Sequence, residues 1–196
     1  MSQSLAKLAG VDLAKVRQQA ALPVEAAVAV QGCTDVESAL QTLEAAGFHL
    51  EAARLMAHAL PKREAVWWAC MCASHTAPAD LPTPDQKARQ MAEDWVRQQT
   101  DKLRREAMAQ AESGGFGTPE AWAAVGAFWS GDSMSPEGQP AVPPAPHLAG
   151  TAVAGSIALA AVRGEVARRA ARLKRFLESG RNIAQGGPGR LPPEET

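Results

Sequence analysis

Cys70, Cys72 and His75 form the closest grouping of metal-ligand side chains in the sequence. Structural zinc sites usually place two ligands at CxxC or HxxxH spacing and add a second pair elsewhere in the chain. Here the two cysteines are separated by one residue on an expected helix, which turns them about 200° away from each other. We therefore expect no metal and no cofactor. Buried cysteines that pack as small hydrophobic side chains are the simpler interpretation.

A cysteine nucleophile activated by a histidine would be a second kind of chemistry. No local signature surrounds any of these residues, and their pairing in space does not follow from the sequence. The segment 114–117 (GGFG) follows no expected strand, so it is neither a Walker motif nor a dinucleotide fingerprint. We therefore expect no catalytic residue and no enzyme, with a small Cys–His enzyme as an alternative. The residues available for such a pair are Cys33, Cys70, Cys72, His49, His58, His75 and His147.

A basic stripe is the first candidate for partner binding. Arg168, Arg172 and Arg175 lie at helical spacing opposite an apolar face. An acidic protein surface could dock there, and nucleic acid more weakly, while a solvated charged face is the plain alternative. Trp129 and His147 complete the set of candidate partner-binding residues.

Tryptophans stand out in a chain with few aromatic residues. Trp is enriched at interaction hot spots, so the five tryptophans could anchor a partner. Filling the core of an Ala-rich bundle is the simpler role, and we expect about three or four of them to be buried. The five are Trp67, Trp68, Trp95, Trp122 and Trp129.

Composition favours closely packed helices. About a fifth of the residues are Ala and Tyr is absent, whereas strands prefer β-branched and aromatic residues. The net charge of −1 lacks the basic excess of a general nucleic-acid binder. An odd count of three cysteines indicates reduced thiols rather than a disulfide framework.

We also expect a cytoplasmic protein without a membrane span. Charged and polar residues interrupt every apolar run near the N-terminus, so no export signal is evident. The longest apolar stretch, residues 148–162, is shorter than the about 20 residues that a spanning helix needs. Its Ala and Gly content predicts a buried core helix.

Two consecutive amphipathic segments predict a helical hairpin. Thr34 and Glu37 have capping-box spacing at the start of an expected helix over residues 35–46. Gly47 stands where a left-handed C-terminal cap is favoured. A second helix over residues 49–60 follows after a short turn, so the two should pack antiparallel.

The rest of the chain alternates helices with Gly- and Pro-rich breaks. Five further helices are expected: residues 61–75, residues 85–112 with a break near Thr100, one that begins at Thr118 and Pro119, residues 148–162, and residues 165–185. The first of these, 61–75, is apolar nearly all round and should therefore lie at the centre of the bundle. Five prolines in residues 132–147 favour an extended path across the surface. The sequence thus predicts an all-α, single-domain irregular bundle of about seven to nine helices. Residues 1–33 form short helices, 34–185 the bundle, and 186–196 a disordered tail.

Five segments together resemble an uncharacterised family of helical bacterial proteins over about residues 35–185. They are ALPKREAVWWAC (59–70), GTPEAW (117–122), AFWSG (127–131), PPAPHL (143–148) and RLKRFL (172–177). Genes of that family often lie in type VI secretion clusters, near genes for spike-tip and adaptor proteins. The resemblance implies an accessory role in secretion and carries over no catalytic residue.

From the resemblance and the absence of a catalytic pattern, we expect a non-enzymatic adaptor or chaperone for type VI secretion effector or spike components. Its partner should be a protein (an effector, spike-tip or adaptor protein) rather than nucleic acid or membrane. Ala-rich helices also leave self-association possible. An immunity protein that binds one cognate toxin is an alternative.

Overall fold

The computed structural model describes residues 5–194, and all regular structure in that range is helical. The predicted all-α irregular bundle is confirmed, and the described residues form ten α-helices, one more than the upper end of the expected range. The helices are α1 (Leu13–Ala20), α2 (Val24–Ala29), α3 (Val36–Ala45), α4 (His49–Ala59), α5 (Lys62–His75), α6 (Thr83–Gln98), α7 (Asp101–Gly114), α8 (Pro119–Trp129), α9 (Leu148–Val162) and α10 (Arg169–Ala184). Two short 3-10 helices are η1 (Ala6–Leu8) and η2 (Val166–Arg168).

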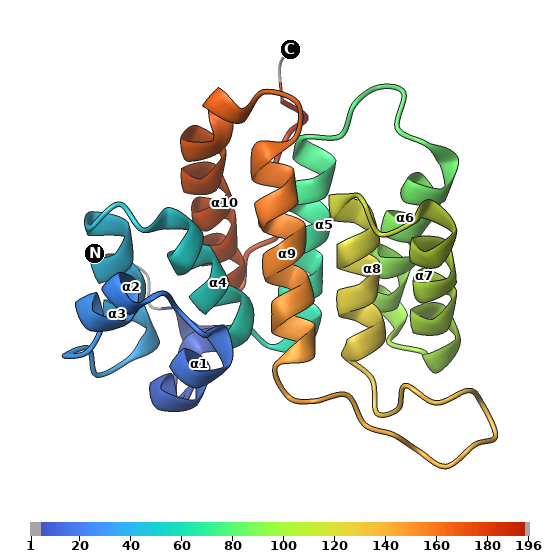
Figure 1. Ribbon diagram of the computed structural model, residues 1–196, viewed down its shortest axis with the longest axis horizontal. Coiled ribbons are helices and arrows are strands. Elements are labelled where there is room, and N and C mark those ends of the chain that lie inside the picture. Colours follow the sequence, from blue (N-terminus) through green and yellow to red (C-terminus); the bar gives the residue numbers. More distant parts are fainter. Residues whose placement is uncertain (1–4, 195–196) are drawn as a thin grey trace.

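Helices α5 and α9 form the centre of the bundle (Figure 1). α9 packs against α4, α5, α8 and α10, while α6 and α7 lie beyond α8 and α1 to α3 gather on the α4 side. Nine of the 14 residues of α5 are buried, which confirms its predicted central place. α9 is 15 residues long and largely buried, as its composition predicted. In the described part of the chain no helix has the length and apolar character that crossing a bilayer requires.

The α3–α4 hairpin forms as predicted, but its cap is shifted by one residue. Asp35, not Thr34, is the N-cap of α3: its carboxylate accepts a hydrogen bond from Ser38 N at 2.8 Å, and Ser38 completes the capping box. The short Asp side chain reaches the N3 amide from the residue directly before the helix, which leaves Thr34 outside. Gly47 has φ +81°, so the predicted left-handed turn between the helices is confirmed.

Helix ends further along the chain follow their sequence signals. The break expected near Thr100 occurs where Gln99 adopts a left-handed conformation with φ +51° and Thr100 caps α7. Thr118 accepts a hydrogen bond from Ala121 N at 3.2 Å, and Pro119 is the first residue of α8. The signals that mark both connections are local in the sequence, which is why the sequence predicted them.

Close approach of α10 to α4 and α5 depends on Gly180. A Cβ at this position would lie 2.3 Å from Met56 Sδ and 3.0 Å from the Trp68 ring. The buried Trp68 indole donates its N–H to the Phe176 carbonyl at 2.8 Å, so α5 and α10 are also joined by a hydrogen bond.

A buried ion pair ties the start of α8 to the end of α9. The Glu120 side chain is fully buried, and its carboxylate accepts a hydrogen bond from Arg163 Nη1 at 2.9 Å and another from Nη2. Arg163 also donates to the Ala73 carbonyl at 3.4 Å at the end of α5. Because a buried carboxylate without a partner is costly, Arg163 is a structural residue of the core.

Residues 132–147 cross the surface in an ordered path, as the prolines predicted. Arg104 donates to the Ser133 carbonyl at 2.6 Å, and Arg105 donates to the Ser135 carbonyl at 2.7 Å. Within the loop, Met134 N donates to the Val142 carbonyl at 2.7 Å. These contacts place Pro144 and Pro146 beside the start of α9.

Two expectations about the core and the tail are wrong. Trp68 and Trp95 are buried, but the other three tryptophans are half-buried, because Trp67 and Trp122 send their indole N–H groups to backbone carbonyls near the surface. The disorder expected for residues 186–196 does not hold for residues 186–194, which lie extended against α5 and α10. Residues 195–196 lie outside the described range.

Candidate functional site

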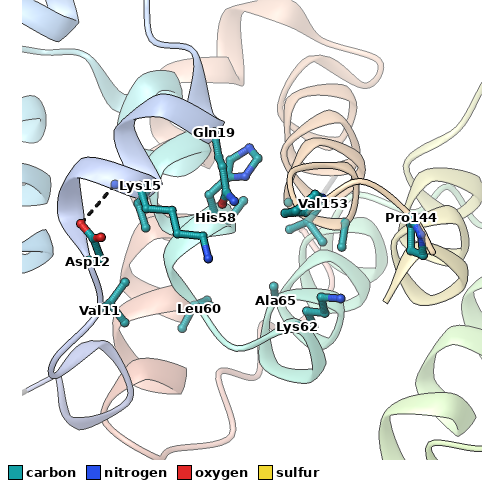
Figure 2. A pocket seen from close by; sticks show the side chains of 15 residues that line it. Val11, Asp12, Lys15, Gln19, His58, Leu60, Lys62, Ala65, Pro144 and Val153 are labelled. Atoms are coloured by element: carbon teal, nitrogen blue, oxygen red, sulfur yellow. Dashed lines mark hydrogen bonds between the residues drawn. The ribbon is translucent and has the colours of Figure 1, made fainter. Parts of the chain in front are cut away.

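Two adjoining hollows on the surface meet at the His58 side chain. The first has a volume of about 500 Å³ and lies between α1, the end of α4, the start of α5, the proline-rich loop and the start of α9 (Figure 2). The second has a volume of about 380 Å³ and lies between α1, α4 and α9. We call the two together the His58 groove. The residues that line both hollows are Gln19 and His58.

The first hollow combines an apolar base with a polar rim. Its base includes the buried side chains of Val16, Leu60 and Val153. Its rim carries the exposed side chains of Lys15 from α1 and Lys62 from α5, and Figure 2 shows Lys15 extending from α1 into the opening. Arg54 lines the second hollow, so the whole groove has basic side chains on three helices.

His58 is held in a neutral form inside this groove. Its partial burial lowers the pKa to about 4, and electrostatic interactions with His147 and Arg54 act in the same direction. The ring lies directly against the backbone of α9, because a Cβ at Gly150 would be 2.3 Å from His58 Nδ1. Gly150 is therefore required for α4 and α9 to approach at this point, and His58 presents an uncharged imidazole to both hollows near neutral pH.

The α1 wall of the groove is fixed at both ends. Asp12 accepts hydrogen bonds from Ala14 N at 2.9 Å and Lys15 N at 3.2 Å, which caps the first turn of α1. Beyond the other end, Arg54 donates to the Ala21 carbonyl at 3.3 Å. The Asp12 carboxylate also lines the first hollow, so three basic side chains, Lys15, Lys62 and Arg54, outnumber one acidic side chain along the groove.

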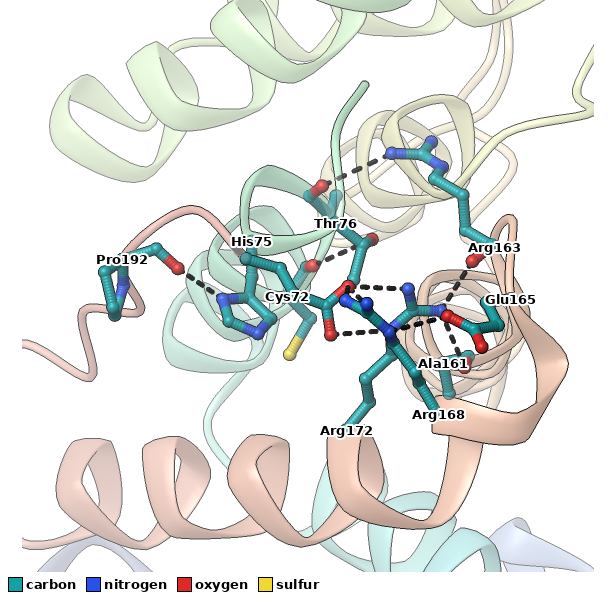
Figure 3. A network of polar contacts seen from close by, with 11 residues as sticks. Cys72, His75, Thr76, Ala161, Arg163, Glu165, Arg168, Arg172 and Pro192 are labelled. Carbon is teal, nitrogen blue, oxygen red and sulfur yellow. Dashed lines mark hydrogen bonds and ion pairs between the residues drawn. The ribbon is translucent and has the colours of Figure 1, made fainter. Parts of the chain in front are cut away.

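The three predicted arginines line one surface hollow but have different roles, and Figure 3 shows two of them, Arg168 and Arg172. Arg172 is buried, donates to the Arg163 carbonyl at 2.5 Å, and pairs with the Glu194 carboxylate at 2.6 Å. Arg168 contacts the same carboxylate at 3.6 Å, whereas Arg175 is exposed. The three do not form a uniform solvated stripe, because the returning tail supplies an internal acidic partner that the helix pattern did not reveal.

The other two predicted residues lie elsewhere. His147 is exposed, lies just before α9, and lines the second hollow of the His58 groove. Trp129 is half-buried at the end of α8, and its ring meets that of Trp122 edge-on with centroids 6.4 Å apart. Of the five predicted residues, the structure brings only His147 to the groove.

The cysteines are placed for packing. Cys70 and Cys72 are fully buried, and burial raises the pKa of both thiols well above the ordinary value. Cys33 is half-buried, with its sulfur 3.5 Å from Thr42 Oγ1. Nucleophilic cysteines need a lowered pKa, so the environment of Cys70 and Cys72 acts against that chemistry.

Sequence reasoning missed the main groove residues. The sequence offered His58 only as a candidate for a Cys–His pair and gave no sign that it meets α9. Lys15 and Lys62 lie on separate helices, and no pattern in the sequence linked the two. The groove arises from contacts between α1, α4 and α9 that are distant in sequence, so helical spacing alone could not have found it.

Comparison with known proteins assigns the chain to a family but adds no role. Residues 39–184 match the model of DUF6931, a family of unknown function, so the chain belongs to that family. Neither the curated proteins nor the solved structures contain a significant match. The matched range includes α4 and α9 but not α1, so the family segment supplies two walls of the His58 groove and α1 adds the third.

Proposed function

We propose that the protein is a non-enzymatic, cytoplasmic adaptor or chaperone that binds a protein partner in the His58 groove. The observation that carries the proposal is the groove itself, about 500 Å³ in its larger hollow, with an apolar base under a basic rim. Apolar grooves with a few polar groups are a recurring means of binding a segment of a partner protein.

The charge of the rim selects the kind of partner. The exposed side chains of Lys15 and Lys62 lie at the rim of the larger hollow, and Arg54 lines the smaller one. The neutral His58 between them can donate or accept a hydrogen bond. An acidic segment with one or two aliphatic side chains would place its apolar groups on Val16 and Val153 and its carboxylates at the rim.

The resemblance of the sequence to a family associated with type VI secretion supports the identity of the partner. We propose that the bound protein is an effector or spike component held before secretion. A Cys–His enzyme would need a reactive thiolate, which burial opposes at Cys70 and Cys72. No feature of the groove favours an immunity role over that of an adaptor.

Affinity capture from a native host under secretion-active conditions tests this proposal. Tagged wild-type protein should recover a type VI effector or spike protein. The double variant Lys15→Glu, Lys62→Glu should recover at least about tenfold less, because two charges at the rim become repulsive.

A matched control separates local from general charge effects. Lys87→Glu, Lys102→Glu makes the same change of net charge at exposed positions on α6 and α7 and should recover the partner normally. Recovery of no secretion component by the wild type, or equal recovery by the groove variant, would reject the proposal.

A further inference from the structure

The C-terminal segment packs against a second surface, whose contacting residues do not line the His58 groove. Residues 186–194 leave α10 and run extended along α10 and α5. Trp67 donates its indole N–H to the Pro188 carbonyl at 2.7 Å, and Ser179 Oγ donates to the Gly189 carbonyl at 2.5 Å. Gly189 N donates in return to Asn182 Oδ1 at 2.8 Å. We call this surface of α5 and α10 the tail groove.

The far end of the tail groove adds a charged contact. The His75 imidazole meets the Pro192 carbonyl, a contact visible in Figure 3, and Glu194 N donates to the His75 carbonyl at 2.8 Å. The Glu194 carboxylate accepts from Arg172 Nη2 at 2.6 Å and from Nε at 3.1 Å. Hydrogen bonds from Arg172 lower the pKa of the Glu194 carboxyl. The groove therefore holds its occupant at both ends.

These contacts define what the groove recognises. Most of them go to backbone atoms of the tail, so they require an extended peptide rather than particular side chains. Selectivity comes from three positions: Leu191 packs against the core, Glu194 pairs with Arg172, and Gly189 allows close approach. A Cβ at Gly189 would lie 2.3 Å from Ile183 Cγ1, and the residue has φ +58°, so a larger residue cannot take its place without strain.

We propose that the tail groove also accepts residues 186–194 of a second copy of this chain, which gives a dimer by exchange of the C-terminal segment. The tail of a second copy is identical to the tail that makes all of these contacts. It can therefore form the same hydrogen bonds and the same ion pair in the groove. Exchange requires a pivot between α10 and the tail, and two adjacent glycines stand there, with Gly186 at φ +95°. Exchange of an identical element between protomers is a low-cost route to a dimer.

The intramolecular arrangement competes with the exchange. A short flexible connection gives the attached tail an effective concentration on the order of millimolar. The wild-type chain should therefore be mainly monomeric at micromolar concentration, and its groove should be closed to added peptide. Ejecting the chain's own tail should open the groove without altering the residues that line it.

Gly189→Val is the variant that ejects the tail. A fluorescent peptide of the sequence GGPGRLPPEET should bind this full-length variant saturably and should bind the wild type at least about tenfold more weakly. The matched control is Gly138→Val, which places the same side chain at another left-handed glycine, φ +82°, in the exposed loop before α9. It should behave as the wild type.

Changes in the peptide test the contacts without affecting the fold of the protein. A peptide with valine at the position of Gly189, or with lysine at that of Glu194, should bind Gly189→Val about tenfold or more weakly than the natural sequence. Equal binding of all three peptides, or no saturable binding of the natural one, would overturn the assignment of the groove as a peptide acceptor.

Deletion of Gly186 and Gly187 tests the second copy as occupant. The deletion shortens the connection by up to about 7 Å, so the tail no longer reaches its own groove but can still reach that of another copy. We expect a dimer by light scattering, which reverts to a monomer when Gly189→Val is added. A monomeric deletion variant would overturn the exchange even if the peptide binds.

Discussion

Removal of His58 should make the stability of the protein less dependent on pH. The pKa of His58 is about 4 in the folded protein, compared with an ordinary value of 6.5 for an unfolded chain. Between these two pH values the unfolded state binds more protons than the folded state. The free energy of unfolding should therefore fall as the pH drops from about 6.5 to about 4, and protonation of His58 should cause no further loss below that.

The size of this effect follows from the same two values. At about 1.36 kcal/mol for each pKa unit, the interval between 6.5 and about 4 sets an upper value of about 3 kcal/mol. The ring is partly exposed to the two hollows, so solvent screening reduces the contribution, and we expect about 1–2 kcal/mol.

Urea unfolding followed by tryptophan fluorescence measures this contribution. The unfolding free energies of the wild type and of His58→Gln should be measured at about pH 7 and at about pH 4.5. Between these pH values the wild type should lose about 1–2 kcal/mol more of its unfolding free energy than the variant does. His49→Gln, at the first residue of the same helix, should keep the wild-type pH dependence. If His58→Gln loses stability with falling pH as steeply as the wild type, the burial of a neutral imidazole against Gly150 is wrong.

Three further substitutions test other parts of the structure by the same unfolding measurement. Arg163→Met should lower the free energy of unfolding by about 3–5 kcal/mol, because the Glu120 carboxylate is left buried without its partner. A loss below about 1 kcal/mol would contradict a stabilising role of this ion pair. Gly180→Val should cost about 1–3 kcal/mol or more, since the added atoms meet the Trp68 ring, and an unchanged midpoint would contradict the close approach. Asp12→Ala should cost about 1 kcal/mol and increase amide exchange in the first turn of α1, whereas unchanged exchange would argue against the cap.

Elements that depend on local signals were predictable from the sequence. The helix expected over residues 35–46 is Val36–Ala45, and the Thr118–Pro119 signal begins α8 where expected. The capping box was assigned one residue too early, because Thr34 and Asp35 can both cap a helix and only the backbone geometry distinguishes them.

The tail shows why the remainder could not be predicted. Its Gly and Pro content is typical of disorder. The side chains that hold it are Trp67 and His75 on α5, which is distant in sequence from the tail, and Arg172 on α10. The same holds for the His58 groove, whose walls come from α1, α4 and α9. Spacing within one helix identifies a face, but it does not identify what that face meets.

Amide hydrogen exchange of the complex with its captured partner tests the central claim, that the His58 groove is the binding surface. We predict added protection in α1, at the end of α4 and in the first turns of α9, with no change in α7. Protection confined to other surfaces, with the amides of α1, α4 and α9 unaffected, would contradict it.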